Sequence, residues 1–421
     1  MTGLPSGWTE VNIEDVLAPL EDGRTIHQGW SPQCDKEPSD NVNSWGVLKT
    51  TSIQRGAFLP EHNKRLPVKL TPRPLLEVRQ GVTCAGPRAR CGVACLVRDT
   101  RPRLMLSGKM YRFRFDDRLV NPRFAEAYLV SDAAARAIDQ MKTGTSESGL
   151  NLTHGRFRKL RIPLPPLSEQ QRIVDAVEEQ LSRLDSASAA LQRVSREGRR
   201  YRRALFQLAI PADSETTTLG ELLERVEAGK SFRALGRPAE PTEWGVIRVS
   251  AMTWGSFLEH ENKAVPQGRT FDPRKEIRPG DLLLSRANTR EYVGASVRVL
   301  DCRPRLLLSD KSLRLVPNRG VDIRWLHLAL SAPTVRERIS AMATGTKDGM
   351  RNISQANLKR VRLPSLTEER QGELADRIES ALSRLDQFHN DLAIASRRAT
   401  TLRTAVLANA FSGRLTHPGA A

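Results

Sequence analysis

The sequence predicts a mixed α/β protein with two tandem globular domains and two long helices that pair antiparallel as a coiled coil. Two proline-rich segments each lead into a long, charged stretch with apolar residues at helical spacing. The stretches before them contain short apolar runs broken by Gly, Pro and Arg, which is typical of strands. The same order of motifs then occurs twice. The expected boundaries are 1–165 and 211–365 for the globular domains, 166–210 and 366–413 for the helices, and 414–421 for a tail.

Length and charge limit the possible functions. A chain of 421 residues can form two or three domains. Its 66 Lys and Arg against 48 Asp and Glu give a net charge of +18, which favours a polyanion such as nucleic acid. The alternative is that Arg serves only solubility. No apolar run reaches the length of a membrane span, and residues 1–8 lack a signal-peptide pattern, so we expect a cytoplasmic protein.

The two helices are expected over residues 168–208 and 367–411. Ser168 and Thr367 precede acidic or amide residues and are the predicted N-caps. Both helices contain the pentapeptide Leu-Ser-Arg-Leu-Asp, at 181–185 and 382–386. Similar apolar stripes predict that the helices bury these stripes against each other, and about 40 residues at 1.5 Å each would span roughly 60 Å. The alternative is two unrelated bundle helices.

An internal duplication is the clearest feature of the chain. Trp45-Gly-Val-Leu-Lys aligns with Trp244-Gly-Val-Ile-Arg at an offset of 244 − 45 = 199. Residues 101–109 then align with 303–311 at an offset of 303 − 101 = 202. The period is too long for a solenoid and predicts a tandem duplication of globule plus helix.

Taken together, these motifs resemble the specificity subunit of a type I restriction–modification system over nearly the whole chain. The motifs are Ser-Glu-Gln-Gln-Arg-Ile-Val after Pro-Leu-Pro-Pro-Leu, the Leu-Ser-Asp-Lys strand, the Gly-Thr…Asn loop before each helix, and the closing stretch 402–413. The first half departs from this pattern at Gly108, where the second half has Asp310. Its stretch from Cys84 to Cys95 also looks about three residues shorter than its counterpart.

The resemblance implies that each globule is a target recognition domain reading half of a split site in double-stranded DNA. It further implies that the paired helices separate these domains and dock two DNA methyltransferase subunits, which motor and endonuclease (R) subunits join. S-adenosylmethionine, ATP and Mg²⁺ are expected on those partners and none on this chain. A membrane is not among the expected partners.

Candidate DNA-binding residues lie in loops of both globules. Arg286, Asn288 and Arg290 follow an apolar strand, and Arg and Asn are the usual bidentate partners of guanine and adenine. The first-domain equivalent is taken as Gly86-Pro-Arg-Ala-Arg, which supplies Arg88 and Arg90. The alternative is an ordinary solvated loop.

Matched lysines and two Gly-Thr loops complete the candidate set. Lys109 and Lys311 end apolar strands and are expected to contact phosphate, with a structural salt bridge as the alternative. Hydroxyl, amide and ammonium groups of the loops 143–151 and 344–352 suit phosphate oxygens, and the alternative is a connecting loop with Asn as a helix cap. The loop candidates are Thr145, Asn151, Thr346, Lys347 and Asn352.

Other possible sites receive plainer interpretations. The basic run 193–203 could follow a duplex or an acidic partner, or be a solvated helix face. Cys84, Cys91 and Cys95 lack zinc-site spacing and a nearby His, so we interpret them as small buried hydrophobes. In the repeat, Cys84 is aligned with Leu283 and Cys95 with Val297.

No catalytic signature stands out. The chain has neither the motifs of amino-methyltransferases nor the acidic cluster of a nuclease centre, and Gly229-Lys-Ser lacks the first glycine of a phosphate loop. We therefore expect a non-catalytic DNA-recognition subunit. Two rival functions are a coiled-coil adaptor that binds protein and a self-sufficient DNA methyltransferase or nuclease.

Overall fold

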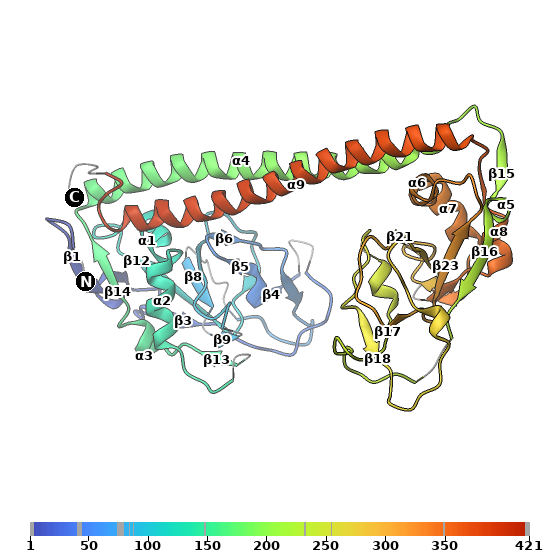
Figure 1. Cartoon of the computed structure of the whole chain (residues 1–421). Helices are drawn as coiled ribbons and strands as arrows, with labels where there is room; N and C mark the ends of the chain where they lie inside the picture. Colours follow the sequence, from blue (N-terminus) through green and yellow to red (C-terminus); the bar gives the residue numbers. More distant parts are fainter. Residues whose placement is uncertain are drawn as a thin grey trace. The chain divides into compact units, whose positions relative to one another are not determined.

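The computed structural model describes residues 4–39, 44–73, 80–83, 85–86, 88–146, 149–230, 233–253, 255–347 and 350–416, without the side chains of 80–83, 85–86 and 346–347. The chain forms two compact units, one of residues 1–191 with 394–421 and the other of residues 192–393 (Figure 1). Each unit contains one globule and one portion of a helix pair. Within the described residues, no helix combines the length and apolar character that crossing a membrane requires.

The first globule is built on an antiparallel sheet in the order β10-β8-β12-β2, with β3 also paired to β12. These strands are β2 (Leu17–Ala18), β3 (Ile26–Gln28), β8 (Gln80–Thr83), β10 (Ala94–Leu96) and β12 (Met110–Phe115). A smaller sheet has the order β11-β4-β7, from β4 (Gly46–Leu48), β7 (Asn63–Arg65) and β11 (Leu104–Met105). Phe113 of β12 and Phe124 of helix α1 (Pro122–Leu129) are fully buried in the core that the main sheet forms with the helices.

The remaining elements of this globule are short. The strands are β1 (Thr9–Asn12), β5 (Ile53–Gln54), β6 (Ala57–Phe58) and β14 (Arg161–Leu164). The helical segments are η1 (Ile13–Val16), η2 (Thr50–Ser52), α1 (Pro122–Leu129), α2 (Asp132–Met141) and α3 (His154–Phe157). Strand β1 pairs with β14, which leads directly into the first long helix.

The second globule repeats this arrangement, which confirms the duplication. Its main sheet has the order β16-β23-β19-β21 and its smaller sheet the order β18-β17-β22. The strands are β15 (Thr216–Thr218), β16 (Leu223–Ala228), β17 (Gly245–Ile247), β18 (Asn262–Ala264), β19 (Leu282–Ser285), β21 (Ser296–Arg298), β22 (Leu306–Leu307), β23 (Ser312–Pro317) and β26 (Arg362–Pro364). The helical segments are α5 (Leu219–Leu222), η3 (Val249–Met252), η4 (Pro273–Lys275), α6 (Ile323–Ser331), α7 (Pro333–Met342) and α8 (Gln355–Lys359).

Two long helices follow the globules: α4 (Leu167–Gln207) has 41 residues and α9 (Glu368–Ala410) has 43. Helix α4 begins before Ser168, and the Pro166 carbonyl accepts the first amide hydrogen bonds, so Ser168 as N-cap is wrong. Thr367 is confirmed as the cap of α9, because its Oγ1 accepts a hydrogen bond from the Arg370 amide at 3.3 Å.

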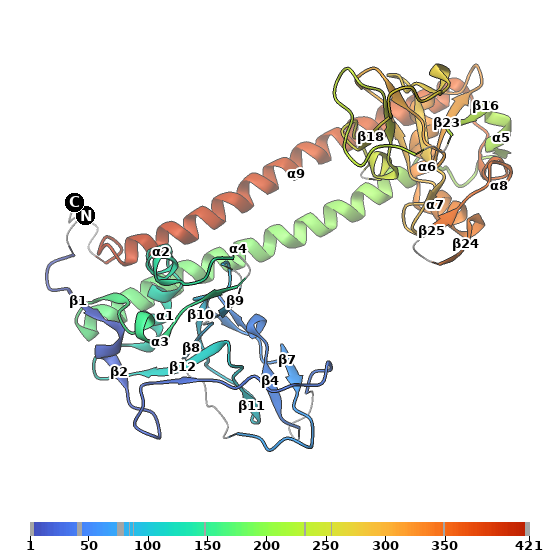
Figure 2. The same ribbon diagram turned by 90° about the horizontal axis from the view of Figure 1, so that it is seen from below.

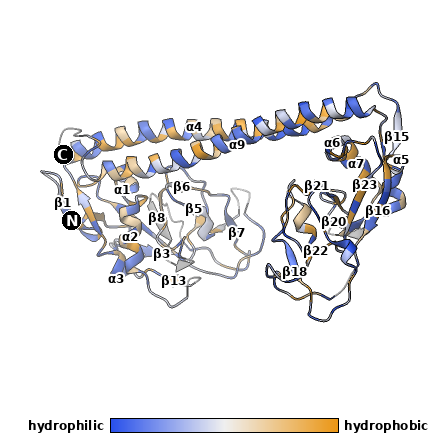
Figure 3. Cartoon of the chain, in the orientation of Figure 1, coloured by the Kyte–Doolittle hydropathy of each residue, from blue (hydrophilic) through white to orange (hydrophobic). Residues whose placement is uncertain are grey.

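The helices pair antiparallel within each unit. In the first unit the Arg403 guanidinium forms an ion pair with Asp185, and in the second Arg202 forms one with Asp386. Both aspartates end the shared pentapeptide, so the duplication also repeats the contact between helices. Beside Arg202, Gly198 leaves room for His389, whose Nε2 would lie 2.5 Å from an added Cβ. Polar residues cover much of both helices (Figure 3).

Candidate nucleic-acid interface

Two predicted segments of the second globule, 286–290 and 344–352, meet in one small sheet of order β20-β25-β24, which we call the second edge sheet. Its strands are β20 (Ala287–Asn288), β24 (Thr344–Lys347) and β25 (Met350–Asn352), and Figure 2 shows β24 and β25 beside α7. Ala287 lies opposite Asn352, and Asn288 lies opposite Arg351. The Arg286 amide donates a hydrogen bond to the Lys311 carbonyl at 2.8 Å, so the matched lysine joins the group through its backbone.

The first globule contains the equivalent arrangement, the first edge sheet. It pairs β9 (Ala85–Gly86) with β13 (Leu150–Asn151). Thr143 and Asn151 exchange two backbone hydrogen bonds of 2.8 Å each, which close the loop that contains the predicted Thr145. Thr145 and Asn151 are both exposed. The duplication therefore places a Gly-Thr…Asn loop against the strand-end segment in each globule.

The predicted side chains of the second edge sheet differ in how far they are engaged. The side-chain amide of Asn288 donates through Nδ2 to Ser285 Oγ at 3.3 Å, and its Oδ1 accepts from the backbone amide of Thr289 at 2.9 Å. These two hydrogen bonds orient the Asn288 side chain. Arg290 and Asn352 are exposed. Arg286 has a buried Nε that no described residue accepts from. The side chains of Thr346 and Lys347 lie outside the described part of the structure.

The two matched lysines lie immediately before the central strands β12 and β23. Within the described residues, neither ammonium of Lys109 and Lys311 lies within 4.0 Å of a carboxylate, so the salt-bridge interpretation gains no support. Phosphate contact stays a prediction. Steric crowding explains why glycine precedes Lys109, because a Cβ on Gly108 would lie 2.7 Å from Ser31 Oγ. Asp310 in the second globule meets no such restriction.

The alternative role of the two asparagines as helix caps is wrong. Asn151 and Asn352 belong to strands, and the residues that precede the next helices are Thr153 and Ser354. Ser354 Oγ accepts a hydrogen bond from the Asn357 amide at 3.1 Å. Both asparagine side chains therefore stay at the edge sheets.

Strand register corrects the alignment of the two halves. The register pairs that fix it are Thr83 with Met110 and Ser285 with Ser312, together with Cys95 with Gly81 and Val297 with Leu283. The offset is 285 − 83 = 202 at one strand and 297 − 95 = 202 at the other. The intervening segments are equally long, so the predicted three-residue shortening is wrong; the length difference precedes these strands. Position 84 then aligns with Arg286, not Leu283, and Cys84 itself lies outside the described residues.

The same register separates the two arginines predicted in the first globule. Arg88 aligns with Arg290, whereas Arg90 aligns with Tyr292. The Arg90 guanidinium donates to the carbonyls of Thr50 and Ile53 at 2.7 and 2.8 Å, so it ties the turn to a neighbouring segment of its own globule.

One buried glutamine near the start of each long helix, not anticipated from sequence, anchors that helix to its globule. Gln170 Nε2 donates to the carbonyls of Leu119 and Pro165 at 2.9 and 2.8 Å, and its Oε1 accepts from the Asn121 amide at 2.8 Å. Gln371 does the same with the Leu366 carbonyl and the Asp322 amide, at 2.9 and 2.8 Å. The two residues are 0% and 2% exposed. Both glutamines occupy the same position in the sequence repeat, and this repetition is the signal from which they could have been predicted.

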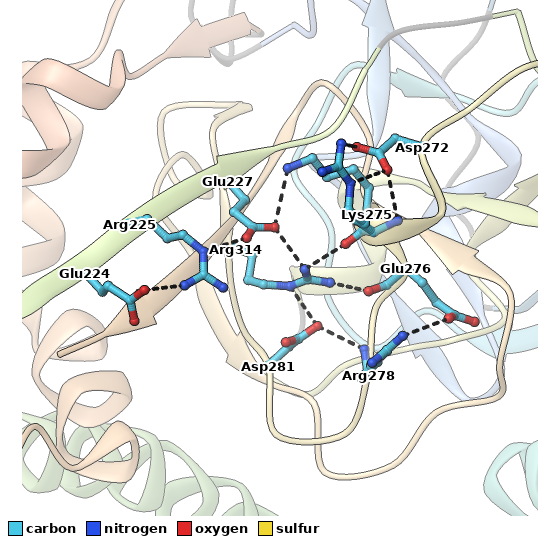
Figure 4. A network of polar contacts seen from close by, with 10 residues as sticks. Glu224, Arg225, Glu227, Asp272, Lys275, Glu276, Arg278, Asp281 and Arg314 are labelled. Carbon is cyan, nitrogen blue, oxygen red and sulfur yellow. Dashed lines mark hydrogen bonds and ion pairs between the residues drawn. The ribbon is translucent and has the colours of Figure 1, made fainter. Parts of the chain in front are cut away.

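A polar network supports the strand that leads to the second edge sheet (Figure 4). Arg314 of β23 donates to Asp281 at 2.9 Å and to Glu227 at 3.0 Å, and also bonds the Glu276 carbonyl. Burial raises the pKa of Asp281, which sits just before β19. Burial also opposes ionisation of Glu227, but the surrounding cations outweigh it and lower its pKa. The network fixes β16, β19 and β23 to one another.

The remaining candidates are structural in the described residues. Cys91 and Cys95 are buried, as predicted, and burial raises the pKa of Cys95 to about 12. No cluster of three or more His, Cys, Asp or Glu suited to a metal occurs in the described part. In the basic run, Arg200 pairs with Glu197 on its own helix at 2.8 Å, whereas Arg202 reaches the other helix. Burial lowers the pKa of Arg202.

Comparison with known proteins finds similarity to specificity subunits of type I restriction–modification systems. A family model for the type I restriction modification DNA specificity domain matches residues 86–193. The EcoEI specificity subunit of Escherichia coli is 36% identical over 192 residues, which are 45% of this chain and 31% of that protein. In that match the chain spans about a third of its relative. The EcoKI specificity subunit of E. coli K12 is 23% identical over 98% of this chain and 90% of its own.

Solved structures share the fold. A chain from a type I restriction–modification system has a TM-score of 0.71 at 20% identity, covering 98% of this chain and 99% of its own. The HsdS subunit of Thermoanaerobacter tengcongensis has a TM-score of 0.55 at 19% identity, covering 97% and 98%. The order of globule and helix and the duplicated edge sheets are consistent with these sequence and structure matches. In sequence and in fold, the chain is similar to the specificity subunits of type I restriction–modification systems.

Proposed function

We propose that this chain recognises a split site in double-stranded DNA and scaffolds the other subunits of a type I restriction–modification complex. The observation that carries the proposal is the repetition of one edge sheet in both globules, each with an exposed Asn and neighbouring cations. Two copies of one reading surface on a duplicated helix pair suit a target with two half-sites. The net charge of +18 supports a polyanionic partner.

The proposed division of labour follows from the side chains available. Arg286, Asn288 and Arg290 suit base edges or phosphates in one half-site. Asn151 suits base edges or phosphates in the other, where Arg88 has the same chemistry but is paired with Asp139 at 3.2 Å. Lys109 and Lys311 are assigned to phosphate, as are the loops with Thr145, Thr346, Lys347 and Asn352. The helix pair acts as the spacer between half-sites and as the docking surface for two methyltransferase subunits, with motor-endonuclease subunits completing the assembly.

We further propose that the chain is not itself an enzyme and works in the cytoplasm. It holds no cofactor in this scheme, and S-adenosylmethionine, ATP and Mg²⁺ act on the partner subunits. The absence of methyltransferase and nuclease motifs from the sequence supports this division. Methyl transfer to DNA by the purified chain alone with S-adenosylmethionine would contradict it.

A selection experiment tests the proposal. The full chain, co-produced with its methyltransferase subunits, is incubated with a library of random duplexes, and the retained sequences are read. The expected result is one motif of two short specific blocks separated by a fixed number of unspecified base pairs. Enrichment of a single continuous block, or none, would contradict the proposal. Binding that is indifferent to salt would instead favour a protein-binding adaptor.

A further inference from the structure

The turn that follows the first strand of each edge sheet packs on the second helix of its globule in the same way. Gly92 and Gly294 both have positive φ, 91° and 78°. An added Cβ would lie 2.4 Å from Ile138 Cγ2 in the first globule and 2.3 Å from Ile339 Cγ2 in the second. These matched close approaches fix the alignment of the turn with the helix, so the residues around them can be compared one by one.

In the first globule, a carboxylate at this place holds two cations. Asp139 of α2 accepts from Arg88 Nη1 at 3.2 Å and from Lys142 Nζ at 2.9 Å. Lys142 Nζ also donates to the Arg88 carbonyl at 2.9 Å. The Lys142 hydrogen bond, with the charges of both cations, lowers the pKa of Asp139, so this carboxyl is ionised at neutral pH. The Lys142 side chain is only 8% exposed, whereas Asp139 is 38% exposed.

In the second globule the same place carries no carboxylate. Asp139 aligns with Ser340 (340 − 139 = 201) and Lys142 with Ala343 (343 − 142 = 201). Ser340 Oγ donates to the Arg290 carbonyl at 3.0 Å, so a hydroxyl replaces the ammonium on the equivalent backbone oxygen. The exposed Arg290 guanidinium has no carboxylate partner among the described residues.

We propose that Asp139 withholds Arg88 and Lys142 from DNA phosphates, so that the two globules bind a duplex with unequal electrostatic strength. The second globule, with Arg290 available, supplies the larger salt-dependent share. A carboxylate beside a phosphate-binding guanidinium both occupies the cation and repels the phosphate, and a phosphate that no cation neutralises keeps its counterion. The inference rests on the proposed function, because it assumes that the edge sheets face DNA.

The test is the salt dependence of binding to a mixed-sequence duplex, which requires no knowledge of the target. The full chain and its variants are titrated at several salt concentrations, and log Kd is plotted against log salt. Asp139→Asn should steepen the slope by about 0.9, the value for one added phosphate contact. Over a fourfold rise in salt, that is roughly a 3.5-fold larger loss of affinity. Ser340→Asp should make the slope shallower by about the same amount.

A matched control separates this mechanism from net charge. Glu179→Gln removes one negative charge and releases Arg183, its 2.6 Å partner on the solvent face of α4, away from either edge sheet. Its slope should equal that of the unaltered chain. Asp139→Ser with Lys142→Ala, which copies the second globule, guards against a folding defect of the single variant and should also steepen the slope.

The outcomes distinguish failure of the proposed function from failure of the inference about Asp139. An unaltered chain that does not bind duplex DNA overturns the proposed function and the inference with it. Salt-dependent binding with unchanged slopes in both Asp139→Asn and Ser340→Asp overturns the inference alone. A slope change in Glu179→Gln as large as that in Asp139→Asn would also overturn it, because net charge would then be the cause.

Discussion

Replacing Gln170 by Met should destabilise the first unit strongly, because this side chain joins the globule to the start of α4. Met has a similar length but cannot make the three hydrogen bonds to the Leu119 carbonyl, the Pro165 carbonyl and the Asn121 amide. All three backbone groups would lose their partner beside a side chain that is 0% exposed. A buried group left without its partner costs about 1–3 kcal/mol.

Partial access of water to the altered site reduces the simple sum, so the expected loss in free energy of unfolding is about 2–4 kcal/mol. Gln371→Met in the second unit removes two such bonds and should cost less. The neighbouring Gln171 is the matched control, because it is exposed and, among the described residues, its side chain bonds only the side chains of Asn121 and Asp175. Gln171→Met should stay within about 0.5 kcal/mol of the unaltered chain.

Two measurements check this prediction. Chemical denaturation gives the change in free energy of unfolding, and hydrogen exchange reports the Asn121 amide directly. In Gln170→Met that amide should exchange faster than in Gln171→Met. Equal stability and equal Asn121 exchange in the two variants would refute the anchoring role.

Two further predictions concern the second unit. Replacing Arg286, Asn288 and Arg290 together by Ala should relax recognition of one half-site, and a single Arg that contacts a base should be worth about 1–3 kcal/mol. Sequence selection should return the other half-site unaltered. Equal loss of both half-sites in a folded variant would be contrary evidence. Burial, with the nearby Arg298 charge, lowers the pKa of His327 to about 4 from 6.5. The unfolded chain therefore binds a proton at His327 at higher pH than the folded chain does. The free energy of unfolding should fall as pH drops from about 6.5 towards 4, by up to about 1.4 kcal/mol per pH unit. Denaturation curves measured across this range should show a weaker pH dependence in His327→Gln.

Much of the fold could be predicted from sequence because the duplication repeats both hydrophobic pattern and order. The apolar stripes of α4 and α9 predicted an antiparallel pair, and the structure confirms it through Asp185 with Arg403 and Asp386 with Arg202. The Gly-Thr…Asn loops were also matched correctly. Periodicity and repeat order survive many substitutions, so they are visible in one sequence.

The details that failed depend on register and on local hydrogen bonds. A gap placed a few residues late aligned Cys84 with Leu283, and only the strand pairing corrected it. Ser168 looked like an N-cap, yet α4 already begins at Leu167 and Pro166 occupies the cap position. The Thr50 and Ile53 carbonyls that bind the Arg90 guanidinium were not foreseen, and DNA contact by Arg90 stays a prediction. Such partners lie far apart in the chain and leave no local pattern.

The central claim, that a helix pair spaces two DNA-reading globules, is tested most directly by lengthening the pair. Four residues inserted after Ser186 and four after Leu402, beside the ion pair of Asp185 with Arg403, add about one turn or roughly 6 Å and keep the apolar stripe close to phase. At 3.4 Å per base pair this is about two base pairs. The motif selected from random duplexes should keep both half-sites and gain about two unspecified base pairs between them. An active variant whose motif kept its original spacing would contradict the claim.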